Sequence, residues 1–206
     1  MTLEFEETLL QAARLAEEAV KAAMSEYASG HLTDEDDITP SLAGHLSARL
    51  KGRVGNLDWS TSVVRHRRGK AAEEKRIGAD LIIHIKFDTH SFKYSKGVLV
   101  QAKKSNKNEF ISKKEHDRLR DQSKTMTHIS PSSFVFNYQH GAMRCGPASR
   151  FEGSTSRNLD ENCVWTSYRF FRELFRCPIG DPRINSSLVK DLFIPIEINI
   201  VAIEIE

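Results

Sequence analysis

Three polar residues, Asp80, Gln101 and Lys103, interrupt two segments that otherwise read as buried strands. Asp80 lies at the start of GADLIIHIKF, residues 78–87, and the other two lie at the end of GVLVQAKKS, residues 97–105. A carboxylate and an amide supply the oxygen ligands that a hard cation such as Mg²⁺ prefers. A lysine beside such a cation can hold a water molecule for attack on a phosphate. These residue types therefore indicate metal-assisted hydrolysis of a phosphate ester.

Strand geometry predicts that the three side chains meet. Side chains alternate along a strand, so Gln101 and Lys103 share one face while Ala102 points to the other. If the strands pair antiparallel across the loop 88–96, the end of the second returns beside the start of the first, next to Asp80. A divalent cation would then compensate the burial of these groups, with the backbone carbonyl of Ala102 as a further ligand. The alternative is an Asp80–Lys103 ion pair that caps the sheet, with Gln101 hydrogen-bonded nearby.

Two helices are predicted ahead of these strands. Apolar residues recur at helical spacing through residues 3–28. Thr39 and Pro40 are typical of the N-cap and the first position of a second helix. We expect an N-terminal helix, residues 1–30, followed by a single domain, residues 31–206. The first helix could serve in oligomerisation or partner binding, or it could pack on its own domain.

The remaining elements follow from the same periodicities. The sequence predicts further strands at residues 59–66, at residues 133–138 and in the C-terminal run LFIPIEINIVAIEIE, helices at residues 111–126 and 164–177, and an irregular stretch at residues 140–158. The first three strands are expected to form a meander. This order of elements indicates an α/β fold in which helices flank a mixed central sheet.

Positive charge is concentrated in two segments, although the net charge is only +2. One surrounds RHRRGK, residues 65–70, and the other follows the second strand and continues to Arg118 and Arg120. Clusters of this kind fit a surface that binds a polyanion, and a solvated charged surface is the alternative. The candidate phosphate-contacting residues are Arg65, Arg67, Arg68, Lys70, Lys104, Lys107, Lys113 and Lys114.

Several function classes are disfavoured by patterns that the sequence lacks. No apolar run is long enough to span a bilayer, and the acidic N-terminus lacks the basic region of a signal peptide, so we expect a cytoplasmic protein without a membrane partner. The three cysteines form no C-x-x-C pair and are expected to be buried thiols. Glycine-rich phosphate-binding motifs are absent, which argues against an ATPase or a dinucleotide enzyme.

The arrangement Ala79-Asp80, then Gln101-Ala102-Lys103, across a strand hairpin resembles the PD-(D/E)XK, or restriction-endonuclease-like, nuclease superfamily. The Gln-x-Lys form is similar to that of Mrr-type restriction enzymes and of effector nucleases in bacterial anti-phage systems. The resemblance implies a restriction-endonuclease-like core. It also implies that Asp80, Gln101 and the Ala102 carbonyl bind the metal, and that Lys103 orients the attacking water and stabilises the transition state.

A further acid from the first core helix is implied by the same resemblance, which covers residues 33–140. Glu35 is our first choice for this acid, because of its position ahead of Ile38 and Thr39. The other candidates are Asp36, Asp37, Glu73 and Glu74. An amide at position 101 carries no charge, so metal affinity is expected to be lower than with a carboxylate there.

The resemblance implies a Mg²⁺- or Mn²⁺-dependent endonuclease that cuts DNA, expected to be double-stranded, as the effector of a prokaryotic anti-phage defence or restriction system. No second domain is evident, so we expect control by a regulatory or sensor protein of the same system or by assembly into a homo-oligomer. Two alternatives stay open. One is a catalytically inactive nuclease-fold scaffold or nucleic-acid-binding subunit of a defence complex, and the other is an RNase or tRNA-targeting effector.

Overall fold

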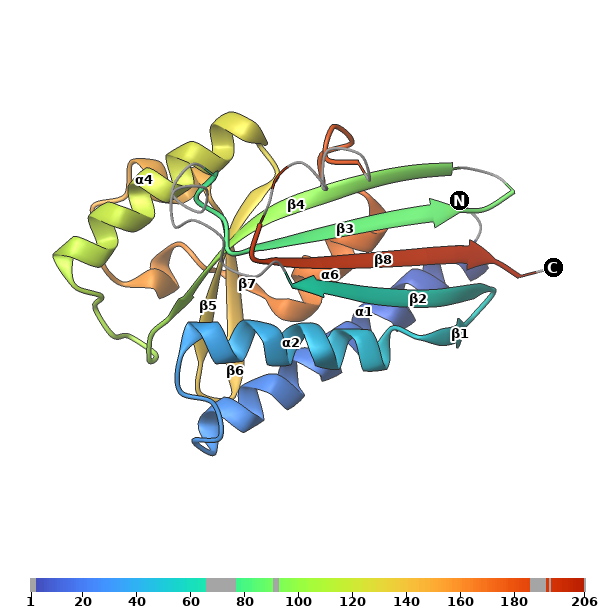
Figure 1. Ribbon diagram of the computed structural model, residues 1–206, viewed down its shortest axis with the longest axis horizontal. Coiled ribbons are helices and arrows are strands. Elements are labelled where there is room, and N and C mark those ends of the chain that lie inside the picture. Colours follow the sequence, from blue (N-terminus) through green and yellow to red (C-terminus); the bar gives the residue numbers. More distant parts are fainter. Residues whose placement is uncertain (1–2, 66–76, 91–92, 186–191, 193, 206) are drawn as a thin grey trace.

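The computed structural model describes residues 3–65, 77–90, 93–185, 192 and 194–205. In these residues the strands are β1 (Gly52–Val54), β2 (Leu57–Arg65), β3 (Leu81–Asp88), β4 (Lys93–Lys104), β5 (Ser133–Gln139), β6 (Ala142–Pro147), β7 (Trp165–Thr166) and β8 (Ile196–Glu204). They form one eight-stranded mixed sheet in the order β1-β2-β8-β3-β4-β5-β6-β7 (Figure 1). The α/β class and the mixed sheet predicted from the sequence are confirmed.

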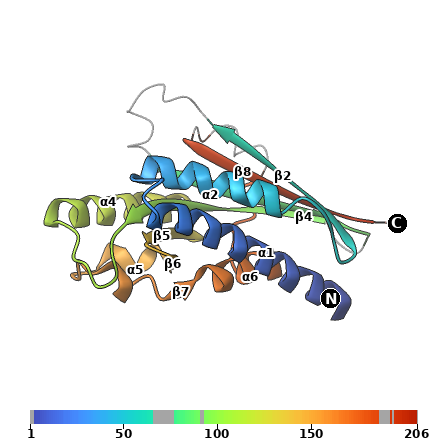
Figure 2. The same ribbon diagram turned by 90° about the horizontal axis from the view of Figure 1, so that it is seen from below.

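Helices pack on both faces of this sheet. They are α1 (Leu3–Ala28), α2 (Glu35–Arg49), α4 (Lys113–Ile129), α5 (Ser149–Glu152) and α6 (Ser167–Arg176), with a 3₁₀ turn, η1 (Leu159–Glu161). Helix α1 lies between α2 and α6 and contacts both (Figure 2). Its apolar stripe, which includes Phe5, Leu9 and Met24, is buried in the main core. Helix α1 therefore packs on the same domain as the sheet.

Apolar residues of the β3–β4 hairpin point alternately to the two faces of the sheet and join two different clusters. Ile83 and Val100 lie in the main core beneath α1, α2 and α6. Ile82 and Leu99, one position away on each strand, lie in a smaller cluster with Met126 of α4. A strand covered on both faces is expected to be apolar at nearly every position, as the continuous hydrophobic runs of β3 and β4 are.

The predicted meander of three consecutive strands is wrong. Strand β8 lies between β2 and β3, antiparallel to the first and parallel to the second. Ile196, Ile198 and Ile200 of β8 face the main core, and Glu197 on the other face is also buried. A strand buried on both faces belongs in the interior of a sheet, which explains why β8 has a neighbour on each side.

The predicted start of the second helix is also wrong. Helix α2 begins at Glu35 with Asp34 as its N-cap residue, and Pro40 lies inside the helix. The three acids of its first turn complement the positive end of the helix dipole, which favours the earlier start. Thr39 is buried rather than capping, and its hydroxyl is hydrogen-bonded to that of Tyr138.

Three smaller expectations need correction. The stretch 140–158 is not irregular throughout, because β6 pairs antiparallel with β5 and α5 follows it. The loop 88–96 is shorter than predicted, since β4 already begins at Lys93. Cys177 is exposed, unlike the buried thiols of Cys145 and Cys163.

Across the segments that the structure describes, every helix is too short or too polar to cross a membrane.

Candidate functional site

The hairpin of β3 and β4 brings Asp80 and Gln101 together, as the strand pairing predicts. Leu81 lies opposite Val100, and the Asp80 N–H donates to the Val100 carbonyl at 2.9 Å. The Asp80 carboxylate accepts hydrogen bonds from the Gln101 amide and, at 3.0 Å, from the Ala102 N–H. The carboxylate is therefore fixed at the end of the hairpin by the strand beside it.

The first turn of α2 supplies a second carboxylate, that of Glu35. One oxygen accepts a hydrogen bond from the Lys104 N–H at 2.9 Å, and the other lies 3.4 Å from Lys103 Nζ. Asp36 also lines the pocket described below, whereas Asp37 does not. Of the candidate acids, Glu35 thus makes direct contact with the predicted lysine.

The other two candidate acids, Glu73 and Glu74, lie outside the residues that the structure describes.

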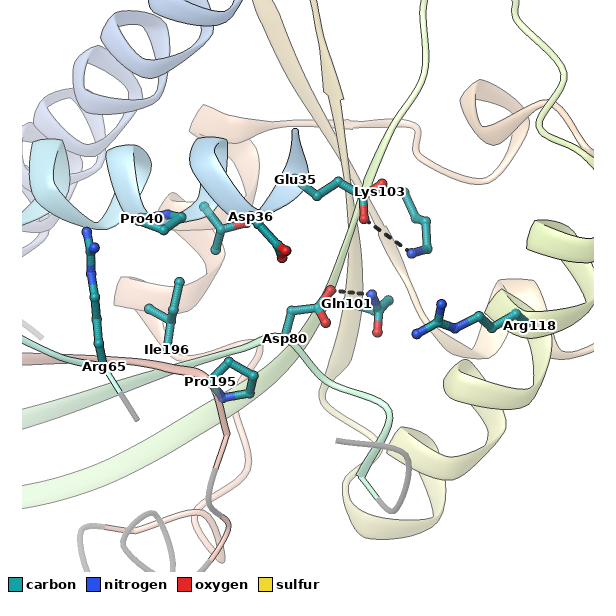
Figure 3. Close-up of a pocket in the computed structure, with 11 residues that line it drawn as sticks. Glu35, Asp36, Pro40, Arg65, Asp80, Gln101, Lys103, Arg118, Pro195 and Ile196 are labelled. Carbon is teal, nitrogen blue, oxygen red and sulfur yellow. Dashed lines mark hydrogen bonds and ion pairs between the residues drawn. The ribbon is translucent and has the colours of Figure 1, made fainter. Parts of the chain in front are cut away.

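These side chains surround a pocket of about 420 Å³ (Figure 3). Its charged lining consists of the acids Glu35, Asp36 and Asp80 and the bases Arg65, Lys103 and Arg118. The acids come from α2 and the start of β3, and the bases come from β2, β4 and α4. Pro195 and Ile196, at the start of β8, close one side. Six elements, α2, β2, β3, β4, α4 and β8, therefore contribute to one polar pocket around the end of the hairpin.

The approach of the hairpin to α4 depends on Gly78. Its φ of +76° lies in the left-handed region that favours glycine. A Cβ atom at this position would lie 2.7 Å from the Gln122 carbonyl oxygen of α4. Only a glycine allows the chain to pass the helix here and turn into Asp80.

A buried hydrogen bond holds the start of α2 against the sheet. The hydroxyl groups of Tyr138 on β5 and Thr39 on α2 lie 3.1 Å apart. Burial raises the pKa of the Tyr138 phenol well above its ordinary value, and the carboxylates of Asp80 and Glu35 raise it further. Sequence reasoning missed this pair, because it assigned Thr39 to a helix N-cap and the chain separates the two residues widely.

The orientation of the Gln101 amide shows what the site can hold. Its nitrogen donates both to the Asp80 carboxylate and to the Ala102 carbonyl, which lies 3.0 Å away. Its oxygen, Oε1, is buried and has no hydrogen-bond partner in the part of the chain that the structure describes. The nitrogen thus occupies the space between two oxygens that a hard cation would take as ligands.

A half-turn of this amide would replace its nitrogen by its unpaired oxygen. Three oxygens would then converge, from Asp80, Gln101 and Ala102, and an all-oxygen set suits Mg²⁺ or Mn²⁺. Within the described ranges, no group of three or more His, Cys, Asp or Glu side chains is placed to hold a metal ion. The residues therefore fit the implied metal only if the amide and the carbonyl serve as ligands.

The predicted phosphate-contacting residues are dispersed. Arg65 lines the pocket, while Arg67, Arg68 and Lys70 lie outside the described residues. Lys104 is paired with Asp34 at 3.0 Å, and this hydrogen bond raises the pKa of the lysine.

The later lysines lie away from the pocket lining. Lys107 lines a different pocket beside Arg144, and Lys113 and Lys114 are exposed at the start of α4. One helical turn further along, Arg118 reaches the candidate site instead. The position of Arg118 depends on how α4 crosses the sheet, which the sequence pattern does not give.

The fold and the site together define a mixed α/β protein with a carboxylate–amide–lysine pocket at the end of a central hairpin. No protein-family model, no curated protein and no solved structure matches the chain. Its function is therefore inferred from the chemistry of this pocket.

Proposed function

We propose that the chain is a Mg²⁺- or Mn²⁺-dependent endonuclease that hydrolyses phosphodiester bonds in DNA. The observation that carries the proposal is the Gln101 amide, which bridges two potential metal ligands while its own oxygen has no partner among the described residues. A buried acceptor left without a partner costs free energy, so a ligand that satisfies it is favoured. The Gln-x-Lys resemblance to PD-(D/E)XK nucleases supports the same chemistry.

Each residue of the site has a defined part in this reaction. Asp80, Gln101 and the Ala102 carbonyl would hold the cation, which would supply an activated water and neutralise charge on the phosphate. Lys103 orients the attacking water and donates to the phosphate oxygens as negative charge builds on them. Glu35, 3.4 Å from Lys103 Nζ, holds that amine in position.

We further propose that the centre of the sheet is a restriction-endonuclease-like core. An antiparallel β3–β4 hairpin, a parallel β5 reached through α4, and a preceding helix with an acid at its start support this assignment. Double-stranded DNA as substrate, a role as effector of a prokaryotic defence or restriction system, and control by a sensor protein or by self-association are proposed on the resemblance.

A second candidate function is a nucleic-acid-binding scaffold without catalysis. The Asp80–Gln101 and Glu35–Lys103 contacts favour it, because they pair the polar groups with one another in the absence of a cation. An RNase is the third candidate, and it would use the same groups on a different substrate.

Cleavage assays separate the three candidates. Plasmid DNA and labelled RNA would be offered together, with Mg²⁺, Mn²⁺ or EDTA, to the wild type and to Asp80→Ala and Lys103→Ala. Lys93→Ala is the matched control, because Lys93 is exposed at the other end of β4. We expect metal-dependent DNA cleavage that falls at least about 100-fold in the two site variants and is unchanged in the control.

Cleavage of RNA alone would favour the RNase. Binding of nucleic acid without cleavage by any variant, also in the presence of a partner protein, would favour the scaffold and overturn the hydrolytic proposal.

A further inference from the structure

We propose that Arg118 on α4 and Arg65 at the end of β2 each bind a backbone phosphate, so that the substrate is a polynucleotide that crosses the pocket rather than a small phosphate ester. The inference rests on the proposed function, because it names the substrate of the same pocket. It depends on which charges in the pocket are already paired and which are free.

Arg118 is a free cation directed at the reacting groups. Its guanidinium extends from α4 toward Gln101 (Figure 3). The residue is exposed, and within the described segments it makes no hydrogen bond or ion pair. Glu115 and Asp121, at three residues to either side, are spaced for ion pairs on a helix. Glu115 instead forms the capping box with Ser112, so the arginine stays available to a ligand.

Arg65 lies on the other side of the catalytic carboxylate. It ends β2 opposite Ile196, and its side chain extends past Ile196 toward Pro40 of α2 (Figure 3). It too is exposed and unpaired in the part of the chain that is described. In the same view Asp80 lies between the two arginines. A chain of phosphates that passes Asp80 would therefore meet one arginine before the reacting phosphate and one after it.

The lysines at and beside the pocket, unlike the two arginines, are already paired with acidic side chains. Lys103 contacts Glu35, and Lys104 is paired with Asp34. The lining carries three acids and three bases, so it is neutral until a divalent cation binds. With the cation, the lining would carry an excess of two positive charges, which favours a polyanion, and the two unpaired arginines are the cations left to receive the phosphates on either side of the reacting one.

The residue type also favours phosphate. The planar guanidinium presents donors that match phosphate oxygens in a bidentate geometry, and such contacts position a nucleic acid without reading its sequence. A mononucleotide or a phosphate monoester would place its phosphate at the cation and leave both arginines without an anion. Two arginines on opposite sides thus point to a substrate with several successive phosphates.

Binding measurements on a cleavage-deficient background test the inference. Fluorescence anisotropy would follow labelled DNA oligonucleotides bound by Asp80→Asn, alone or combined with Arg118→Ala, Arg65→Ala or Arg118→Lys, over a range of salt concentrations. The matched control is Arg150→Ala, because Arg150 is an exposed arginine on α5 outside the pocket lining. All four changes are on the surface, and melting curves would verify that each variant is folded.

We expect Arg118→Ala and Arg65→Ala each to weaken binding about tenfold and to lower the salt slope by about 0.9, the value for one lost phosphate contact on duplex DNA. Arg118→Lys should keep the salt slope but bind DNA less tightly, because lysine retains the charge but lacks the bidentate guanidinium. A mononucleotide should compete poorly. Affinities and slopes equal to those of Arg150→Ala, or a mononucleotide that competes as well as an oligonucleotide, would overturn the inference.

Cleavage by the protein with Asp80 intact distinguishes this inference from the proposed function. Binding that depends on the two arginines, with no cleavage under Mg²⁺ or Mn²⁺, would reject hydrolysis and keep the polynucleotide site. Metal-dependent cleavage, together with an affinity for DNA that neither arginine substitution changes, would reject the phosphate contacts but support the nuclease proposal. A protein that binds no oligonucleotide would reject both.

Discussion

Two lysines of strand β4, Lys96 and Lys103, lie in very different environments. Lys96 is only 2% exposed, its amine donates to the Ile179 carbonyl, and its stem packs against Gly180. Lys103 keeps 12% of its side chain exposed, lies 3.4 Å from Glu35 and lines the pocket. The first lysine is enclosed by the fold, whereas the second opens onto a cavity.

Their surroundings differ more than their burial does. Near Lys96, the Tyr94 ring lies 5.9 Å from the amine and the Tyr94 hydroxyl contacts Cys177, so polar atoms face one another. Near Lys103, the Gln101 oxygen has no partner in the described residues, and Arg118 lines the pocket with its guanidinium directed toward Gln101. A buried polar group therefore indicates a ligand site only where its neighbours stay incompletely satisfied around a cavity.

Among the variants that test this comparison, Gln101→Glu is expected to change the free energy of unfolding most. Without a cation, the new carboxylate faces Asp80 in a buried position, so the free energy of unfolding should fall by about 4 kcal/mol. Mg²⁺ should restore most of it, because a second carboxylate ligand strengthens the site. Urea unfolding in EDTA and in Mg²⁺ measures both changes. Gln101→Ala serves as control, and a variant as stable as the wild type in EDTA would show that the two side chains do not face each other.

Lys96→Met tests the enclosed lysine. Burial lowers the pKa of Lys96 from 10.5 to about 8, with the nearby Cys177 opposing the shift. Between these values the unfolded chain binds more protons than the folded one, so wild-type stability should rise with pH relative to Lys96→Met. The total gain should approach about 3 kcal/mol.

Unfolding free energies of both proteins below pH 8 and near pH 10.5 give this difference directly. A difference that does not change with pH would mean that Lys96 titrates normally and is not enclosed.

Gly78→Ala acts on the route by which the chain enters the site. The left-handed conformation alone should cost about 2 kcal/mol, and the contact with the Gln122 carbonyl would displace the hairpin from α4. We expect a lower melting temperature together with reduced cleavage, because Asp80 follows two residues later. Gly153→Ala, where an added Cβ meets nothing within 4 Å, is the control. Equal melting of the two variants would contradict the close approach.

The smallest effect is expected for Tyr138→Phe. Loss of the phenol leaves the buried Thr39 hydroxyl without its partner and should cost about 1 kcal/mol. Thr39→Val removes the other partner, and the double variant should cost less than the sum of the two single changes. Chemical unfolding of the four proteins measures this coupling. Strict additivity would show that the bond does not hold α2 against β5.

The sequence was sufficient for the local part of this site. Alternation fixes which side chains of β4 share a face, and an antiparallel hairpin fixes which of them meets Asp80. The position of Glu35 ahead of Ile38 and Thr39 likewise predicts the acid that contacts Lys103. The Asp80–Gln101 contact spans two strands joined by a short turn, whereas the contact of Glu35 with Lys103 joins the distant elements α2 and β4.

Long-range placement could not be predicted in the same way. The insertion of β8 beside β3 depends on pairing between distant segments, which local periodicity does not encode. Arg118 reaches the site, and Thr39 meets Tyr138, only because of the way in which α4 and α2 pack on the sheet. The start of α2 was misassigned because Pro40 gives a strong local signal that the acidic first turn overrides.

Cleavage and stability measured on the two lysine variants test the central claim most directly. Lys103→Ala should lose metal-dependent cleavage of DNA at least about 100-fold while its unfolding free energy changes by less than about 1 kcal/mol. Lys96→Met should alter stability and its pH dependence while cleavage continues at the wild-type rate. Wild-type cleavage by Lys103→Ala, or equal loss of cleavage in both variants, would contradict the assignment of the pocket as the catalytic site.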